Sequence, residues 1–176
     1  RIEDIDQTRC RPEFEASLVE DLAWLGLDWS GEVRRQSDHF ADYSTVLNAL
    51  RAQGLVYRCF LTRREIAARL PAGADPDEGG LVSHPLGRAE EAERLAHNAP
   101  YAWRLSLDAA RDTLGPLFRD LAYAEWAQTG PRTISARPDR FGDVVLARKD
   151  TPASYHLACC HDDALQGVTH VIRGED

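Results

Sequence analysis

Tyr155-His156-Leu157-Ala158, with Asp162-Asp163 and then Val171-Ile172-Arg173-Gly174 after it, is the most informative stretch of this chain, together with Arg1-Ile2-Glu3-Asp4-Ile5-Asp6 at the other end. The two stretches place an acidic hexapeptide, a tyrosine and an arginine on the two flanks of one globular unit. Such a set of side chains is what a pocket for an amino acid needs, because the carboxylate can bind an ammonium group and the guanidinium can bind a carboxylate.

The composition is that of an ordinary globular protein. At 176 residues, with 43% apolar and 28% charged residues, the chain is long enough for one domain, with room for a small inserted subdomain. No run approaches the roughly 18 apolar residues of a membrane span, and nothing resembles a signal peptide. The four cysteines lack the paired spacing of a disulfide framework, so we expect a reducing cytoplasm.

The charge distribution leaves two interpretations open. A net charge of -8 argues against a nucleic-acid partner, because neutralising phosphates requires clustered Lys and Arg. One stretch is nevertheless crowded with arginines against the single Glu65, namely at Arg51, Arg58, Arg63, Arg64 and Arg69. The stretch could face a nucleic-acid backbone, or it could be a solvated helix face.

Hydrophobic spacing and capping residues predict alternating helices and strands. Helices are expected at 12–25, from about 38 to 53, at 62–70, 88–97 and 155–165, and strands at 55–60, 101–107, 144–147 and 168–172, while 117–126 is ambiguous. Thr62-Arg63-Arg64-Glu65 fits a capping box, and 71–80 is a loop rich in Gly, Pro and Asp. The alternation favours an open, mostly parallel α/β sheet with ligands beyond the carboxyl ends of its strands, where Arg173 and the first six residues would lie.

Several motifs then carry a family resemblance, because they follow one another in order over nearly the whole chain. Besides the two stretches quoted above, they are Leu25-Gly26-Leu27-Asp28-Trp29, Gln36-Ser37, Gly54-Leu55-Val56-Tyr57-Arg58-Cys59, Thr62-Arg63, Gly142-Asp143-Val144-Val145-Leu146 and Gln166-Gly167-Val168-Thr169. Only about residues 71 to 135 do not align. The chain resembles the catalytic core of class I glutamyl-tRNA synthetases, and most closely their short paralogues, the glutamyl-queuosine tRNA(Asp) synthetases.

The resemblance implies a Rossmann-like catalytic core with an inserted smaller α+β subdomain. Residues 1–57 and 141–176 would form the core, and 58–140 the inserted subdomain. Glu3 would hold the ammonium group of the substrate glutamate, Tyr155 would hydrogen-bond the substrate, and Arg173 would pair with one of its carboxylates. Taken alone, Glu3 could be an ordinary surface carboxylate, Tyr155 a core aromatic residue at a helix start, and Arg173 part of a surface salt bridge.

The family's other substrates are ATP, with Mg²⁺, and tRNA. Activation joins the α-carboxylate of glutamate to the α-phosphate of ATP, so positioning and charge stabilisation matter and no catalytic acid or base is expected. Asp6, Arg63 and Arg64 are candidate contacts to the tRNA acceptor end. The H-I-G-H and K-M-S-K-S motifs of the class do not occur in these 176 residues, so we expect a fragment that is inactive alone.

The sequence predicts no metal site. His156 with Cys160, and Cys159 with Asp163, share helix faces at i, i+4, but the two faces diverge, whereas zinc needs three or four convergent ligands. Cys159 and Cys160 are expected to fill small apolar positions against the sheet. The short paralogues often carry a C-x-C zinc motif, but here Cys59 is followed by Phe60 and Leu61, and residues 62–158 contain no cysteine.

Within the family, three features favour the queuosine branch: the short gap from Trp29 to Gln36, the run from Asp143 to Asp150, and Cys159 in place of an asparagine. That branch attaches glutamate to the modified base of tRNA(Asp). A glutamyl-tRNA synthetase core, a non-catalytic module that binds tRNA or an amino acid, and a thiol or metal protein remain the alternatives. We expect a monomer.

Overall fold

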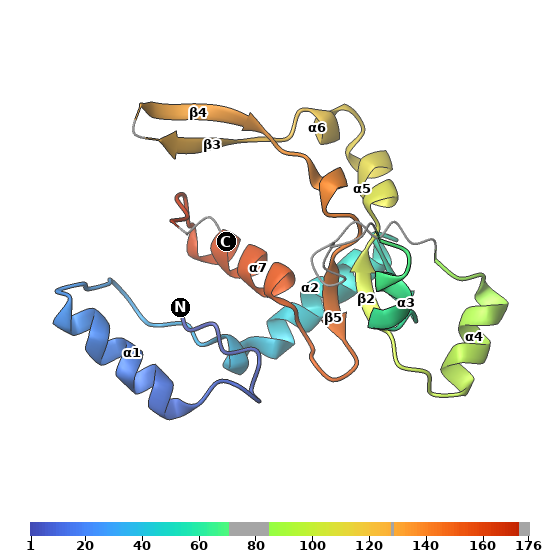
Figure 1. The fold of residues 1–176 in the computed structure, drawn as a ribbon, viewed down its shortest axis with the longest axis horizontal. Coiled ribbons are helices and arrows are strands. Elements are labelled where there is room, and N and C mark those ends of the chain that lie inside the picture. Colours follow the sequence, from blue (N-terminus) through green and yellow to red (C-terminus); the bar gives the residue numbers. More distant parts are fainter. Residues whose placement is uncertain (71–84, 128, 173–176) are drawn as a thin grey trace.

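The computed structural model describes residues 1–70, 85–127 and 129–172. A central body contains the helices α2 (Phe40–Ala52) and α7 (Tyr155–Gln166) beside a small sheet (Figure 1). Three parts project from this body, namely α1 (Pro12–Trp24), α4 (Arg88–Ala96) and a hairpin of two strands.

The remaining elements are short. They are the 3-10 helices η1 (Gln36–His39) and η2 (Pro138–Arg140), the helices α3 (Arg63–Ala67), α5 (Leu107–Leu114) and α6 (Pro116–Arg119), and the strands β1 (Val56–Cys59), β2 (Ala102–Leu105), β3 (Ala122–Ala127), β4 (Gly130–Ser135) and β5 (Val145–Arg148). The ambiguous segment 117–126 therefore divides into the end of α6 and most of β3.

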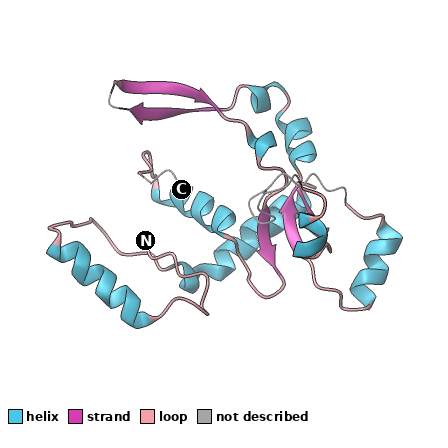
Figure 2. Ribbon diagram, viewed as in Figure 1, coloured by secondary structure: helices cyan, strands magenta, loops and turns pink. Residues whose placement is uncertain are grey.

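The sheets are antiparallel, which corrects the mostly parallel sheet expected from the sequence. β2 lies between β1 and β5, pairs antiparallel with both, and carries an irregularity between Trp103 and Arg104. β3 and β4 form the separate hairpin (Figure 2). In the described residues, parallel pairing is limited to the bridge between Ile2 and Arg35. Helices between strands do not enforce parallel pairing unless the chain crosses over the sheet, and here it returns antiparallel.

The strand expected at 168–172 is also absent, since the described residues there follow α7 without pairing to another strand. Ile172 is 98% exposed. A run of β-branched residues becomes a strand only where a neighbouring strand can accept its hydrogen bonds, and the described residues place no strand beside 168–172.

Local signals predicted the helix ends well. Pro12 is at the first turn of α1, Thr62 and Glu65 form the capping box of α3, and the Ser154 hydroxyl accepts a hydrogen bond from the Leu157 amide. Gly167 ends α7 in the left-handed conformation, with φ of 65°. These features depend on contacts within about four residues, which the sequence specifies directly.

The main core lies between α2, β5 and α7. It is built from Tyr43, Leu47, Leu146, Ala147, Ala153, Leu157 and Ala158. A smaller cluster of Tyr57, Cys59 and Ile66 lies between β1 and α3. α1 contributes no buried residue, and Phe14 and Leu18 are about half exposed or more, although their spacing predicted an inward face.

No helix in the described ranges is both long and apolar enough to cross a membrane.

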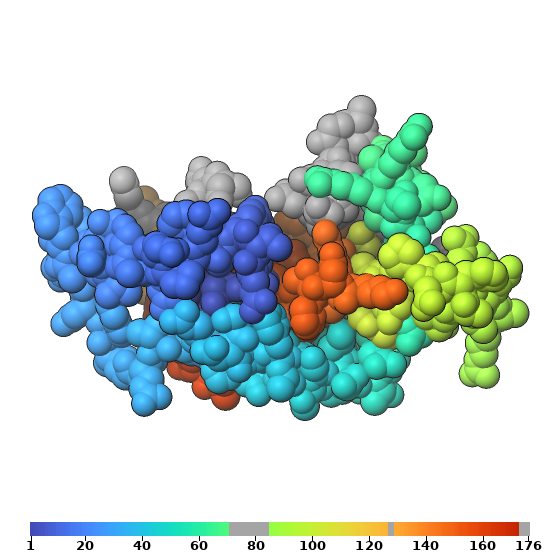
Figure 3. All heavy atoms as spheres, turned by 90° about the horizontal axis from the view of Figure 1, so that it is seen from below, coloured from blue at the N-terminus to red at the C-terminus, as the bar shows by residue number. Residues whose placement is uncertain are grey.

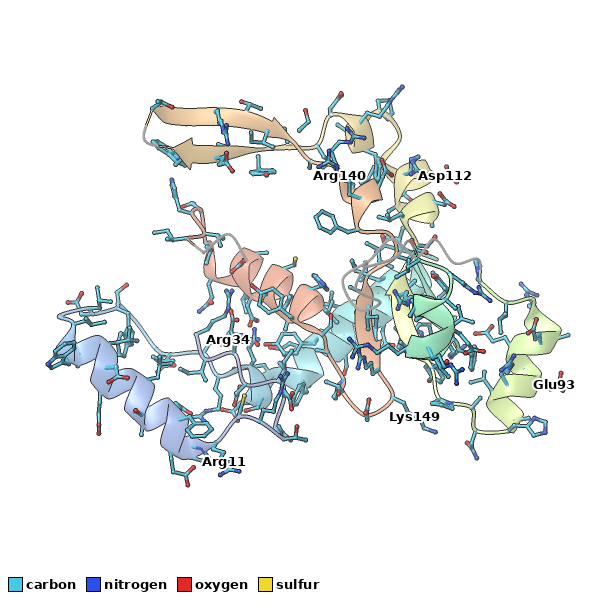
Figure 4. All side chains as sticks on the ribbon, in the orientation of Figure 1. Arg11, Arg34, Glu93, Asp112, Arg140 and Lys149 are labelled. Atoms are coloured by element: carbon cyan, nitrogen blue, oxygen red, sulfur yellow. The ribbon has the colours of Figure 1, made fainter. Side chains whose placement is uncertain are left out.

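The buried side chain of Asp162 on α7 forms hydrogen bonds to the segment before α2 and to α2 itself. Its carboxylate accepts hydrogen bonds from Arg34 Nε at 2.9 Å, Gln36 Nε2 at 3.0 Å and the Tyr43 hydroxyl at 2.9 Å. Arg34 also pairs with Asp42 on α2 and lies between the N-terminal segment and α7 (Figure 4). Residues 34–36 and α2, which follow one another in the chain, are therefore both fastened to α7 by one fully buried carboxylate.

We predict that Asp162→Ala lowers the free energy of unfolding by about 3 kcal/mol or more, because Arg34 and the Gln36 amide would be left buried without their shared acceptor. Urea denaturation followed by circular dichroism measures the effect. Asp112→Ala, at an exposed position on α5, is the matched control and should change stability little. Equal stability of the two variants would contradict the role given to Asp162.

The same carboxylate should make stability depend on acid pH. Burial by itself would raise the pKa of Asp162, but the hydrogen bonds from Gln36, Tyr43 and Arg34 outweigh it and lower this pKa in the folded protein. Its contribution is therefore complete above the unfolded pKa of about 3.9 and is lost as the pH falls through the lower folded pKa.

We expect the stability advantage of the wild type over Asp162→Asn to shrink below about pH 4, since asparagine does not titrate. Urea denaturation of both proteins over a series of pH values checks this. Parallel pH profiles for the two proteins would show that Asp162 is not responsible.

Candidate functional site

The first residues of the chain are fastened along the segment that precedes α2. The Ile2 amide donates to the Arg34 carbonyl at 2.8 Å, and the Gln36 amide donates to the Ile2 carbonyl at 3.0 Å. Asp4 accepts from the Ser37 amide at 2.9 Å and from the Ser37 hydroxyl at 2.6 Å. Because Glu3 lies between these two attachments, its backbone position is set on both sides.

Glu3 then reaches α7. Its Oε1 accepts from Arg1 Nε at 3.0 Å and from the Cys159 thiol at 3.4 Å. Arg1 in turn pairs with Asp163, one helical turn beyond Cys159. The Glu3 carboxylate is therefore held by donors on one oxygen, while no described residue donates to Oε2. An acceptor oriented in this way can bind an ammonium group.

Tyr155 lies on the same face of α7 as Cys159, because residues four apart in a helix are neighbours on its surface. It is the first residue of the helix and is 51% exposed. The structure thus brings Glu3 and Tyr155, two of the predicted glutamate-binding residues, to one side of α7, about one turn apart along the helix. The third, Arg173, lies outside the described residues.

A cavity of about 610 Å³ opens beside Glu3. The N-terminal segment and the start of α1 line it, with Arg1, Glu3, Arg35, Ser37, Phe14 and Leu18 among its residues. Figure 3 shows the N-terminal segment and α1 together at one end of this face and α4 at the other. The lining carries both cations and carboxylates, but none of its residues comes from α7, so Tyr155 and Cys159 do not line this cavity.

Cys159 acts as a hydrogen-bond donor in this arrangement. Burial, followed by the neighbouring charge of Glu3, raises the pKa of its thiol to about 11, so the thiol stays protonated near neutral pH. A protonated thiol is a poor nucleophile, which makes covalent catalysis by Cys159 unfavourable. The neighbouring Cys160 is exposed, so the expectation that both cysteines fill apolar positions is wrong for Cys160.

Asp6 is separated from this arrangement by its own turn. It accepts hydrogen bonds from the Thr8 hydroxyl at 2.6 Å, the Thr8 amide at 3.1 Å and Arg9 Nε at 2.5 Å. The bonds from Thr8 and Arg9 lower the pKa of Asp6 to about 2. The structure does not bring this carboxylate into contact with Glu3.

Arg63 and Arg64 begin α3, which lies across the sheet from α7 (Figure 1). Both are exposed. Arg58 is different, because its side chain pairs with Glu91 at 2.7 Å and stacks over Trp103, 4.5 Å from the ring centre. Arg51 lies over the same ring at 4.5 Å. The arginine-rich stretch is therefore not one continuous surface: part of it fastens α4 to the sheet.

Sequence reasoning missed the supports of the site. Asp4 and Gln36 lie in quoted motifs and Cys159 directly follows one, yet none of the three was predicted to hold Glu3. Their spacing could not reveal it, because Gln36 and Cys159 are 123 residues apart along the chain. Among the described residues, no group of three or more His, Cys, Asp or Glu side chains is arranged to hold a metal ion.

Comparison with known proteins assigns the chain to the class I aminoacyl-tRNA synthetases. Residues 1–176 match the family described as tRNA synthetases class I (E and Q), catalytic domain. The chain belongs to this family of tRNA synthetases, which includes those for glutamate and glutamine.

Comparison with individual proteins leads to the same family. The chain is 43% identical over 180 aligned residues to a protein of Rhodobacter capsulatus named glutamyl-Q tRNA(Asp) synthetase, covering 100% of this chain and 64% of that protein. It is 36% identical to a glutamate–tRNA ligase of Aquifex aeolicus, covering 35% of that protein. A glutamate tRNA ligase of Elizabethkingia meningosepticum, solved in complex with its amino acid, superposes with a TM-score of 0.68 at 26% identity, over 99% of this chain and 36% of the other. The chain thus spans from about one third to two thirds of the length of these relatives.

We predict that Cys159 reacts with iodoacetamide at least about tenfold more slowly than Cys10 near neutral pH, because the Cys159 thiol is buried and its pKa is raised, whereas Cys10 is exposed. Mass spectrometry of timed samples measures both rates in one reaction. Glu3→Gln should speed labelling of Cys159 and leave Cys10 unchanged, since the glutamate charge is one cause of the raised pKa. Equal rates at the two cysteines would contradict the geometry.

Proposed function

We propose that the protein activates glutamate with ATP and transfers it to the queuosine base of tRNA(Asp). The observation that carries the proposal is the Glu3 carboxylate, held on Oε1 by Arg1 and by Cys159 of α7, the helix that begins with Tyr155. The choice of acceptor is supported by the higher identity to the glutamyl-Q tRNA(Asp) synthetase than to the glutamate–tRNA ligase.

Glutamate would bind with its ammonium group on Glu3 and with a hydrogen bond to Tyr155. Arg173 would pair with one substrate carboxylate, because its planar guanidinium can bind both oxygens at once. The free α-carboxylate oxygen attacks the α-phosphorus of ATP, the bond to pyrophosphate breaks, and glutamyl-adenylate forms. The nucleophile is already an anion, so the residues of the site contribute orientation and charge stabilisation. Mg²⁺ enters with ATP as part of the substrate.

The second step joins the activated glutamate to the RNA and releases AMP. Asp6, Arg63 and Arg64 are proposed contacts to the tRNA. The Asp6 carboxylate is hydrogen-bonded to Thr8 and paired with Arg9. Any effect of Asp6 on RNA binding would therefore act through the conformation of the turn formed by residues 6–9. We further propose that the protein acts as a monomer in the cytoplasm.

The proposed division into a core of 1–57 and 141–176 with an insertion of 58–140 agrees with the packing. The main core draws its buried residues from α2, β5 and α7, on both sides of the insertion. The projecting α4 and the β3–β4 hairpin fall within the insertion. β1, β2 and β5 form the sheet where the two parts meet.

A glutamyl-tRNA synthetase is the second candidate, because several relatives at 35–36% identity are named as glutamate–tRNA ligases. A module that binds tRNA or an amino acid without chemistry is the candidate from another class. The three candidate functions differ in whether glutamate is attached to tRNA and, if it is, at which position.

The deciding experiment incubates the protein expressed from the complete reading frame with labelled glutamate, ATP and total tRNA that either contains or lacks queuosine. Label found only on queuosine-containing tRNA(Asp) supports the proposal. Label on a tRNA 3′ end without need for queuosine supports the glutamyl-tRNA synthetase, and no label supports the binding module.

We predict that Arg173→Ala abolishes glutamate-dependent pyrophosphate exchange in that protein while its circular dichroism spectrum is unchanged. A substrate carboxylate left without its cation costs about 2 to 5 kcal/mol, which corresponds to a loss of about 30-fold or more. Arg140→Ala, at an exposed position in η2, serves as the control and should keep the wild-type rate. An unchanged exchange rate in Arg173→Ala would reject the assigned role.

A further inference from the structure

A second cavity, of about 570 Å³, lies on the side of the sheet away from Glu3. The connection from β1 to α3, the start of β2 and the turn after β5 surround it, and its lining includes Phe60, Arg63, Tyr101, Arg104, Arg148 and Lys149. Figure 4 shows Lys149 in the turn after β5, near α3. A cavity of this size lies within the range of about 300–1,000 Å³ typical of small-molecule sites.

Arg104 is the unusual residue of this cavity. Its side chain is 2% exposed, and Nη1 donates to the Asp143 carbonyl at 2.6 Å. Nε is buried and has no hydrogen-bond partner. The Asp143 carboxylate is occupied elsewhere, by the Tyr57 hydroxyl at 2.8 Å and the Leu107 amide at 2.9 Å. Arg104 forms no ion pair with any carboxylate in the part of the chain that the structure describes.

Other arginines with largely buried side chains form ion pairs with carboxylates. Arg1 pairs with Asp163, Arg34 with Asp162, and Arg58 with Glu91. A buried guanidinium without an anion is unfavourable, because the charge has lost its hydration without gaining a counter-charge. Among the described residues, Arg104 therefore presents a buried guanidinium that has no carboxylate partner and is suited to bind an anion.

The rest of the lining favours a phosphate ester. Arg63, Arg148 and Lys149 add positive charge, against Asp150 among the described lining residues. Arg63 and Arg148 have other interactions, so the argument rests on Arg104 and on the position of Lys149. Phe60 and Tyr101 line the same cavity with ring centres 5.5 Å apart, and aromatic rings are the groups on which nucleic-acid bases stack.

We propose that this cavity binds one nucleotide, with the phosphate on Arg104 and Lys149 and the base against Phe60 and Tyr101. An RNA strand and a free nucleotide share this chemistry. If the bound nucleotide is part of an RNA strand, the cavity adds an RNA contact on the far side of the sheet from the proposed glutamate site. This part of the inference rests on the proposed function.

Isothermal titration calorimetry of the 176-residue chain tests the proposal with three probes: inorganic phosphate, AMP and a short single-stranded RNA. Arg104→Met and Lys149→Ala should each weaken nucleotide binding by about tenfold or more, since each removes a charge-assisted contact. Arg119→Ala removes an exposed arginine outside the cavity and should bind as the wild type does. No ATP or glutamate is added, so failure of the ligase activity cannot be mistaken for failure of this site.

Thermal unfolding separates a binding role from a structural one. If Arg104 serves an anion, Arg104→Met should melt no lower than the wild type without phosphate, because an unpaired buried charge has been removed. The phosphate probes should then raise the melting temperature of the wild type and not that of Arg104→Met. Lys149→Ala, at an exposed position, keeps the test decisive if Arg104→Met fails to fold.

Binding of RNA that depends on Arg104 and Lys149 supports the site and assigns it to a strand, whereas AMP binding without RNA binding supports the site and assigns it to a free nucleotide. Absence of binding by all three probes overturns the proposal. Equal binding by Lys149→Ala, Arg119→Ala and the wild type also overturns it.

Discussion

The buried carboxylate of Asp162 is the interaction on which the arrangement of the proposed glutamate site depends. It gathers Arg34, Gln36 and Tyr43 onto α7, and the Gln36 backbone in turn holds Ile2. A continuous path of hydrogen bonds therefore runs from the interior to the residue beside Glu3. Because a buried carboxylate is tolerated only when its oxygens are satisfied, these donors are held together as a set.

This support would orient the carboxylate of the proposed glutamate site. Activation of an amino acid by ATP needs no base, so the protein contributes chiefly through orientation. Glu3 has one oxygen occupied by Arg1 and Cys159, which fixes the direction of the other. Cys159 contributes as a protonated donor, which agrees with a site that positions its substrate and does not attack it. The cavity around Arg104 would add a separate contact, based on charge and stacking, across the sheet.

Sequence reasoning succeeded where an interaction is local or where a motif is long. The capping box at Thr62 and the left-handed end of α7 at Gly167 were predicted because each depends on residues close in the chain. The glutamate-binding role of Glu3 and Tyr155 came from motifs in order along the chain and stays a prediction; the structure shows Glu3 in contact with Cys159, one helical turn after Tyr155 on α7. The parallel sheet and the strand at 168–172 were wrong, since strand direction and pairing depend on distant partners.

The sequence by itself determined several helix ends, many element positions and the family, because caps, turns and ordered motifs are properties of neighbouring residues; α5 and the β3–β4 hairpin were not predicted. Only the tertiary structure decided which charges are buried and which are paired. Asp162 meets Arg34 across 128 residues of chain, and Cys159 is buried while Cys160, the next residue, is exposed. Arg104 and Arg58 are alike in sequence character, yet only Arg58 finds a carboxylate among the described residues. Burial and pairing arise from the way distant segments pack, and no local pattern records that packing.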